Sequence, residues 1–162
     1  TADLSELVAE VARRHVPRAL RAGVDIELEP ADVPLLVLGN RVMLEEAVDN
    51  LIDNALKYGC VDGGRIVLHV AQEEQSAVLT VADDGPGIPS DDAERVFDRF
   101  VRLSDDDSGD GCGLGLSIVR AIVGSLGGEV VFLPVVSGCT VRLSLPLAEP
   151  QALVNSEEIA AE

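Results

Sequence analysis

Four polar residues that could bind a ligand recur along one stretch of the sequence: Glu46, Asn50, Asn54 and Lys57. Their spacing places them in a single stripe if the stretch is helical. Asparagine is a poor helix former because its amide competes with the backbone for hydrogen bonds, so two asparagines one turn apart need an explanation. Amide oxygens can bind a hard cation such as Mg²⁺, and Lys57, the only lysine of the chain, can neutralise phosphate. The alternative is a solvated helix face that binds nothing.

A second candidate ligand group is Asp83, which follows an apolar run and begins the segment Asp83-Asp-Gly-Pro-Gly-Ile-Pro89. A carboxylate at a strand end can accept a hydrogen bond from a ligand amino group, while glycines beside it let the ligand approach the backbone. Glycines also alternate with other residues from Gly109 to Gly115, before a helical pattern, and backbone N–H groups in such a loop suit phosphate. Each pattern alone has a plain alternative: an ordinary turn at Asp83, and a flexible hinge for the glycines.

Hydrophobic periodicity predicts the elements that must hold these residues. It predicts helices over residues 3–23, over 44–58, over 92–100, and from Gly113 to the glycine pair at 127–128. Alternating or short apolar runs predict strands over residues 24–29, 33–38, 65–71, 77–82, 129–133 and 139–145. Helices therefore alternate with strand pairs joined by hairpins. This order predicts an α/β fold, a two-layer sandwich in which helices cover one face of a mixed sheet.

The composition restricts the classes of ligand. A chain of 162 residues fits one domain, and its 12 basic against 29 acidic residues give a net charge of −17. This charge argues against nucleic acid or an anionic membrane surface as a partner, and an anionic ligand would need local compensation. No long apolar run and no charged-then-apolar leader occurs, so we expect neither a membrane span nor an export signal. The three cysteines lack CxxC spacing, which predicts no disulfide framework and no zinc site.

The order of these motifs resembles the nucleotide-binding catalytic domain of bacterial sensor histidine kinases, within the wider family of DNA gyrase, the MutL repair proteins and a class of chaperones. Residues 50–58 resemble the N box, 83–88 the first glycine box, 96–100 the F box and 111–116 the second glycine box, and Gly138-Cys-Thr140 resembles the closing Gly-x-Thr. The resemblance covers residues 1–146 and implies a Bergerat-type ATP-binding fold with a mobile lid at residues 90–112. We expect residues 147–162 to be an acidic, disordered tail.

The resemblance implies a role for each matching residue. Asp83 would receive the adenine amino group, supported by Thr140. Asn54 would ligate Mg²⁺, while Asn50, Lys57 and Arg102 would act on the phosphates and form the catalytic set. The remaining ATP-binding residues would be Tyr58, Gly85, Gly87, Ile88, Arg99, Gly111, Gly113, Leu114, Gly115 and Leu116.

Asn50 separates two chemistries within this family. The hydrolysing branches have a glutamate one turn before the metal-binding asparagine, where it acts as general base on water. An amide cannot take a proton at neutral pH, so Asn50 favours transfer of the γ-phosphoryl group to a protein nucleophile. Two alternatives stay open: a nucleotide-sensing module that has lost catalysis, and an ATPase in which Glu46 serves as the base.

Several features depart from the family pattern. Val101 follows the F box where an aromatic residue is usual, Asp84 replaces the commoner asparagine, and residues 105–110 carry several aspartates. Neither His15 nor His69 has the residues that follow a phosphoacceptor histidine, so both are expected to be structural. The acceptor would lie on a separate upstream domain through which the parent kinase dimerises, with a response regulator downstream. The expected location is the bacterial cytoplasm, with the parent protein anchored in the inner membrane.

Overall fold

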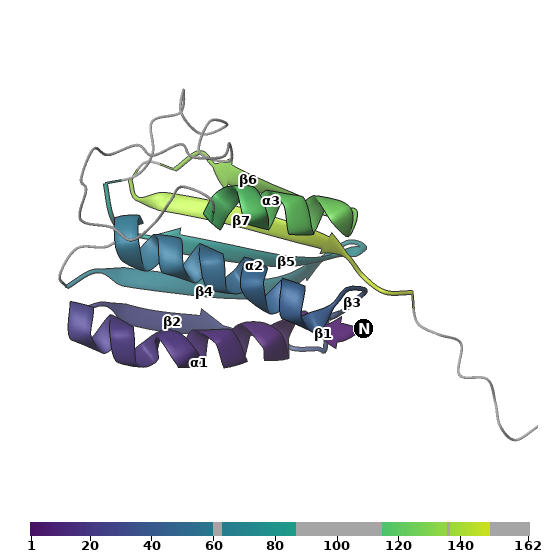
Figure 1. Cartoon of the computed structure of the whole chain (residues 1–162), viewed down its shortest axis with the longest axis horizontal. Helices are drawn as coiled ribbons and strands as arrows, with labels where there is room; N and C mark the ends of the chain where they lie inside the picture. The colour runs from purple at the N-terminus through teal and green to yellow at the C-terminus, as the bar shows by residue number, and fades with distance from the viewer. Residues whose placement is uncertain (60–62, 87–114, 136, 150–162) are drawn as a thin grey trace, which may run out of the picture.

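The structure is a computed structural model, and it describes residues 1–59, 63–86, 115–135 and 137–149 (Figure 1). The predicted short helix over 92–100 and the predicted lid, 90–112, lie outside the described residues. The described elements are β1 (Ala2–Asp3), α1 (Leu4–Ala22), β2 (Asp25–Glu29), β3 (Leu36–Val37), α2 (Arg41–Asn54) with a π-helical turn at Ala55–Gly59, β4 (Arg65–Glu73), β5 (Ser76–Asp83), α3 (Gly115–Ser125), β6 (Glu129–Leu133) and β7 (Cys139–Pro146).

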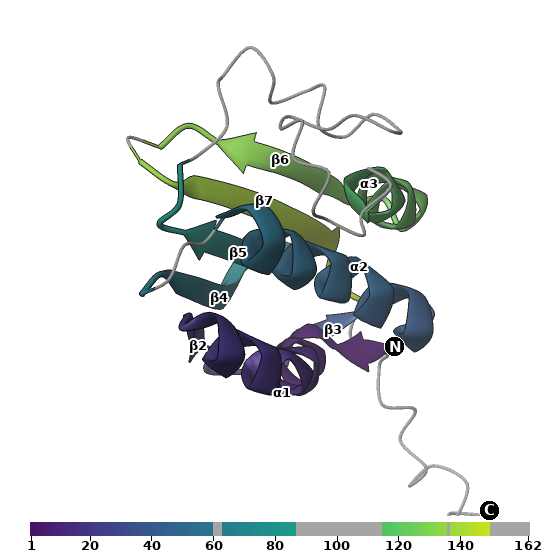
Figure 2. The ribbon, with the colours of Figure 1, turned by 60° about the vertical axis from the view of Figure 1, so that its left-hand side comes forward.

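The main sheet has five strands in the order β2-β4-β5-β7-β6. β2 runs parallel to β4, and the other neighbours are antiparallel, which makes the sheet mixed. α1, α2 and α3 lie side by side over one face of this sheet (Figure 2). The predicted fold class is therefore confirmed. A separate pair of short strands, β1 and β3, lies near the start of α1.

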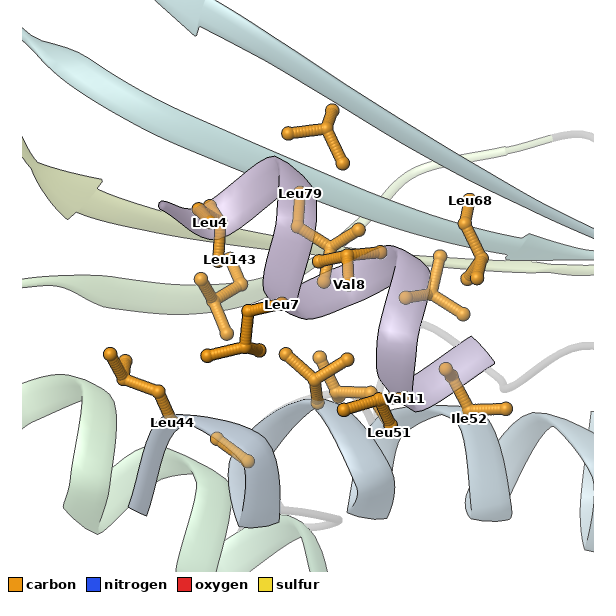
Figure 3. Packing of buried hydrophobic residues seen from close by; sticks show 14 of the residues in the cluster. Leu4, Leu7, Val8, Val11, Leu44, Leu51, Ile52, Leu68, Leu79 and Leu143 are labelled. Carbon is orange, nitrogen blue, oxygen red and sulfur yellow. The ribbon is translucent and has the colours of Figure 1, made fainter. Parts of the chain in front are cut away.

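The core lies between the helices and the sheet. One row of paired residues, Val70, Leu79, Leu143 and Val130, crosses four strands, and all of them are buried. Strand residues alternate between faces, so the neighbouring row, which includes His69, Thr80 and Arg142, belongs to the face without helices. The helices meet the core with Leu4, Leu7, Val8 and Val11 of α1 and Leu44, Leu51 and Ile52 of α2 (Figure 3).

Helix α1 confirms the predicted first helix. The side chain of Asp3 caps it by accepting from the Ser5 backbone N–H at 3.0 Å, and it ends at Gly23, whose φ of 69° is the left-handed conformation that glycine adopts readily. His15 is buried, and its Nε2 lies 2.8 Å from Asp49 Oδ1 on α2. This contact supports the expected structural role of His15.

Two predicted elements differ in extent from the observed ones. The strand expected over 33–38 is only β3, Leu36–Val37, because Pro34 has no N–H with which to join a ladder. The helix expected over 44–58 begins earlier, at Arg41, since the side chain of Asn40 caps the N–H groups of Val42 and Met43. It is α-helical only to Asn54 and continues as the π-helical turn, a change that α-helical periodicity cannot reveal.

Two glycines near the end of α3 offer a test of the packing between α3 and β7. A β-carbon at Gly128 would lie 2.2 Å from the Ser144 carbonyl oxygen, whereas one at Gly124 would meet nothing within 4 Å. We expect Gly128→Ala to lower the free energy of unfolding by about 1–3 kcal/mol through overpacking. Gly124→Ala should raise it by about 0.5–1 kcal/mol, because alanine is the better helix former. Urea denaturation measures both, and equal effects of the two variants would contradict the described packing.

Candidate functional site

The candidate residues that the structure describes gather at one end of the molecule. The C-terminal ends of α2 and β5 and the N-terminal ends of α3 and β7 all lie at this end (Figures 1 and 2). They carry Asn50, Asn54 and Lys57; Asp83 and Gly85; Gly115 and Leu116; and Thr140. The other predicted site residues, Gly87, Ile88, Arg99, Arg102, Gly111, Gly113 and Leu114, lie outside the described residues, as does the side chain of Tyr58.

The two asparagines of α2 face the first residue of α3. A β-carbon at Gly115 would lie 3.1 Å from Asn50 Oδ1 and 3.9 Å from Asn54 Oδ1, so a side chain there would fill the space beside both amide oxygens. The other end of the Asn50 amide is occupied, because its Nδ2 donates to the Glu46 carbonyl oxygen at 2.9 Å. Two oxygen donors therefore converge at the start of a helix, where no side chain from Gly115 covers them. Oxygen donors of this kind suit a hard cation.

Lys57 lies in the π-helical turn and forms an ion pair within its own helix. Its Nζ is 3.1 Å from Asp53 Oδ2, and Asp53 Oδ1 accepts a hydrogen bond from Arg18 Nη1 on α1. Burial works to raise the pKa of Asp53, but the hydrogen bonds from Arg18 and Lys57 outweigh it and hold the pKa below its usual value. Asp53 was not among the predicted site residues. Its i, i+4 spacing from Lys57 was the signal that could have identified it.

Asp83 is half-buried at the end of β5. Its Oδ1 accepts the backbone N–H of Gly85 at 3.0 Å, and the backbone amide of Cys139 also hydrogen-bonds to the carboxylate. Burial nevertheless raises the pKa of Asp83, and the nearby charge of Asp84 acts in the same direction. No cation partners this carboxylate in the described part of the chain. The Asp83 carboxylate can therefore accept further hydrogen bonds beyond those that the described residues donate.

The neighbour of Asp83 on β7 differs from the expected one. The register pairs Asp83 with Cys139, whereas Thr140 pairs with Ala82 and so belongs to the opposite face of the sheet. The expected support of Asp83 by the Thr140 side chain therefore does not match the register. Burial, with the charge of Asp83, raises the pKa of Cys139 to about 12, so this residue is a neutral thiol at physiological pH.

Gly138 brings β7 against the end of β5. A β-carbon at this glycine would lie 2.0 Å from the Asp83 carbonyl oxygen, and its φ of 73° is a conformation that other residues rarely adopt. Only glycine meets both conditions. The closing glycine of the motif therefore sets the backbone position from which the Asp83 side chain extends.

Two cavities among the described residues lie away from this end. A cavity of about 380 Å³ lies beside the β4–β5 hairpin, where Arg142 pairs with Glu73, and one of about 170 Å³ lies beside Gly124 and Gly128.

Within the described ranges, no three His, Cys, Asp or Glu side chains are grouped so that they could hold a metal ion. A search of the same residues finds no helix with the length and apolar content to cross a membrane.

Residues 39–149 match the family described as "Histidine kinase-, DNA gyrase B-, and HSP90-like ATPase". The chain is 36% identical over 152 residues to the sensor protein kinase PmrB of Pseudomonas aeruginosa. The aligned segment covers 91% of this chain and 30% of that protein. The chain thus spans about a third of the length of this curated relative.

Solved structures show the same architecture. The mycobacterial sensor histidine kinase MprB superposes with a TM-score of 0.80 at 32% identity, over 90% of this chain and 97% of that one. Full-length ShkA, solved in complex with AMPPNP, superposes with a TM-score of 0.78 at 29% identity, over 91% of this chain and 30% of that one.

The raised pKa of Asp83 predicts a pH-dependent stability. In the folded protein this carboxyl holds its proton to a higher pH than in the unfolded chain, so its contribution favours folding below the unfolded pKa of about 4 and is lost as pH rises through the raised folded value. We expect Asp83→Asn to stabilise the nucleotide-free protein near pH 7. Thermal unfolding measured from pH 4 to pH 7 should show a smaller loss of stability with rising pH in the variant. An unchanged slope would contradict this account.

Proposed function

Because the chain belongs to the histidine kinase-, DNA gyrase B- and HSP90-like ATPase family, we propose that it binds Mg-ATP and transfers the γ-phosphoryl group to a histidine of a separate domain. One observation carries the proposal: the amide oxygens of Asn50 and Asn54 lie beside Gly115, the first residue of α3, and this helix start is at the same end of the molecule as the C-terminal end of β5, where Asp83 stands. In this proposal, one side of this end would bind the phosphates and the metal, and the other side would bind adenine. The part of the family motif that falls on residues 87–114 is outside the described residues.

The adenine side of the proposed site depends on Asp83. Its carboxylate would accept a hydrogen bond from the exocyclic amino group of adenine, which guanine does not present at the same position. Burial makes this hydrogen bond stronger, because a partly desolvated charge has less water to compete with the ligand. The resulting preference is for ATP over GTP.

The phosphate side fits a magnesium ion shared with a triphosphate. Mg²⁺ retains several waters and takes only one or two protein ligands beside phosphate oxygens, so the missing carboxylate cluster in the described residues is no obstacle. Asn54 Oδ1 would be the protein ligand, and Asn50 would contact the phosphates or the water shell of the ion. The bound ion would offset phosphate charge that a chain of net charge −17 would otherwise repel. Lys57 would add a positive charge from the π-helical turn.

The reaction we propose is transfer and not hydrolysis. The histidine nitrogen of the acceptor forms a bond to the γ-phosphorus, the bond to the bridging oxygen breaks, and ADP leaves with that electron pair. At the position where hydrolysing relatives carry a base, this chain has Asn50, whose amide donates to the Glu46 carbonyl and cannot take a proton from water. Positioning and electrostatic stabilisation would supply the rate.

The acceptor histidine would belong to another domain. His15 is buried against Asp49, and His69 belongs to the sheet face opposite the helices, so neither histidine lies at the candidate site. We propose that the acceptor lies on an upstream helical domain that dimerises the parent kinase, and that a response regulator receives the phosphoryl group. The parent protein would be anchored in the bacterial inner membrane, with this domain in the cytoplasm.

Two measurements test the proposal. Titration of the purified chain with ATP and GTP, with and without Mg²⁺, should show tighter binding of ATP and a dependence on Mg²⁺. Mixing the chain with Mg-ATP and a separately made helical hairpin that carries a phosphoacceptor histidine should yield phosphohistidine. Nucleotide binding without transfer to any acceptor would instead favour a sensing module, and steady phosphate release that Glu46→Gln abolishes would favour an ATPase.

Replacement of Asp83 should weaken nucleotide binding selectively. We expect Asp83→Asn to cost about 1–3 kcal/mol of ATP-binding free energy, because a hydrogen bond to a charged acceptor is lost or reversed. Asp84→Asn is the comparison variant: it removes the neighbouring negative charge, but the Asp84 side chain accepts the Arg65 backbone N–H at 3.0 Å, so it should change ATP affinity less than Asp83→Asn does. Calorimetry measures both affinities. Equal ATP affinity of wild type and Asp83→Asn would show that the adenine pocket has been assigned wrongly.

A further inference from the structure

Asp53 is placed between two cations that come from different helices. Its Oδ2 lies 3.1 Å from Lys57 Nζ, and its Oδ1 accepts a hydrogen bond from Arg18 Nη1 of α1. All three side chains are partly buried: 27% of Asp53, 28% of Lys57 and 37% of Arg18 is exposed. Each carboxylate oxygen therefore has its own cation, and neither contact displaces the other.

This arrangement fixes Lys57 without cancelling its charge. A lysine ammonium on a four-carbon stem has many rotamers, and holding it in one place costs conformational entropy that must be met before a ligand binds. A carboxylate that holds the ammonium in advance lowers this cost, but a lone carboxylate would also neutralise it. Because Arg18 supplies a second positive charge, the group of Arg18, Asp53 and Lys57 keeps a net charge of about +1.

From these contacts we propose that Asp53 is a positioning residue for phosphate binding: fixed by Arg18, it orients the Lys57 ammonium at the triphosphate side of the site. The inference rests on the proposed function, because it requires a ligand with phosphate groups at this end of the molecule. Arg18 belongs to α1, so this helix would contribute to the site although it carries no residue of the nucleotide-binding motifs.

The chain contains a matched control on the same helix. Glu45 accepts from two arginines in the same manner: its Oε2 lies 2.9 Å from Arg14 Nη2 and its Oε1 lies 3.0 Å from Arg41 Nε. It also joins α1 to α2, but it lies two turns before Asp53, and its ion pairs in the described part of the chain are with arginines that are not candidate site residues. A loss of function that came merely from weaker α1–α2 packing would be shared by Glu45→Gln and Asp53→Asn.

The experiment compares binding of Mg-ATP and of adenosine, which has no phosphate, to the full chain and its variants. Asp53→Asn should weaken Mg-ATP binding roughly three- to tenfold and leave adenosine binding unchanged, and Arg18→Gln should act in the same direction. Glu45→Gln should leave both affinities at the wild-type value. In a Lys57→Gln background, Asp53→Asn should have no further effect, because the residue that it positions is gone.

A direct readout of Lys57 is available because it is the only lysine. Labelling with ¹³C,¹⁵N-lysine gives a single Nζ signal, which should move toward the free-lysine position in Asp53→Asn and Arg18→Gln but not in Glu45→Gln.

The remaining outcomes count against the proposal in distinct ways. Unchanged or tighter Mg-ATP binding by Asp53→Asn would overturn it, since Asp53 would then be neutral or a competitor of phosphate. A parallel loss of Mg-ATP and adenosine binding would overturn it as well, because that pattern reports general damage. If the wild type fails to bind Mg-ATP at all, the proposed function itself fails, and this is seen before any variant is compared. If Asp53→Asn does not fold, Arg18→Gln carries the same test.

Discussion

The contact between the polar stripe of α2 and the first turn of α3 is the constraint on which this end of the molecule depends. Helix α2 buries Leu44, Leu51 and Ile52 toward the sheet, and this burial determines where its asparagines point. Gly115 can approach them because it has no β-carbon. A second glycine, Gly138, allows a still closer approach between β7 and the end of β5, because a β-carbon there would lie 2.0 Å from the Asp83 carbonyl oxygen. Hydrophobic burial thus sets the orientation of the α2 side chains, and the two glycines allow the short distances between the neighbouring elements.

The two acidic residues of this end have opposite electrostatic roles. Asp53 is saturated by Arg18 and Lys57, which hold its pKa below the ordinary value against the effect of burial. Asp83 has backbone amides but no cation among its described neighbours, and burial raises its pKa. A carboxylate whose two oxygens are both paired with cations stabilises the protein and positions those cations. A carboxylate without a cation can still accept a hydrogen bond from a ligand. Environment, and not residue type, separates the two roles.

The sequence predicted those parts of the structure that follow from periodicity and order. The apolar spacing of α1, α2 and α3 and the alternation along β4, β5 and β7 predicted the elements and the sandwich, and motif order predicted that Asn54 and Asp83 would share one end. It could not predict the π-helical turn, because apolar spacing does not distinguish one widened turn. Strand register is likewise set by contacts across the sheet. The sequence alone therefore could not show that Asp83 pairs with Cys139 and not with Thr140. The ion pair between Asp53 and Arg18 depends on how α2 packs against α1, and sequence spacing does not reveal that packing.

The position of β1 has a mechanical consequence. β1 pairs with β3, and Val37 of β3 also bridges to Leu147 just after β7, so β1 lies at the end of the molecule remote from the C-termini of α2 and β5 (Figure 1). Helix α1 has 19 residues and separates these ends by roughly 28 Å at about 1.5 Å per residue. If the chain binds a nucleotide as proposed, a histidine joined ahead of β1 would start that far from the γ-phosphate, while bond formation requires approach to within about 3–3.5 Å. Delivery of a phosphoryl group to such a histidine would then require the connection ahead of β1 to bend, and the angle of that connection would decide when transfer can occur.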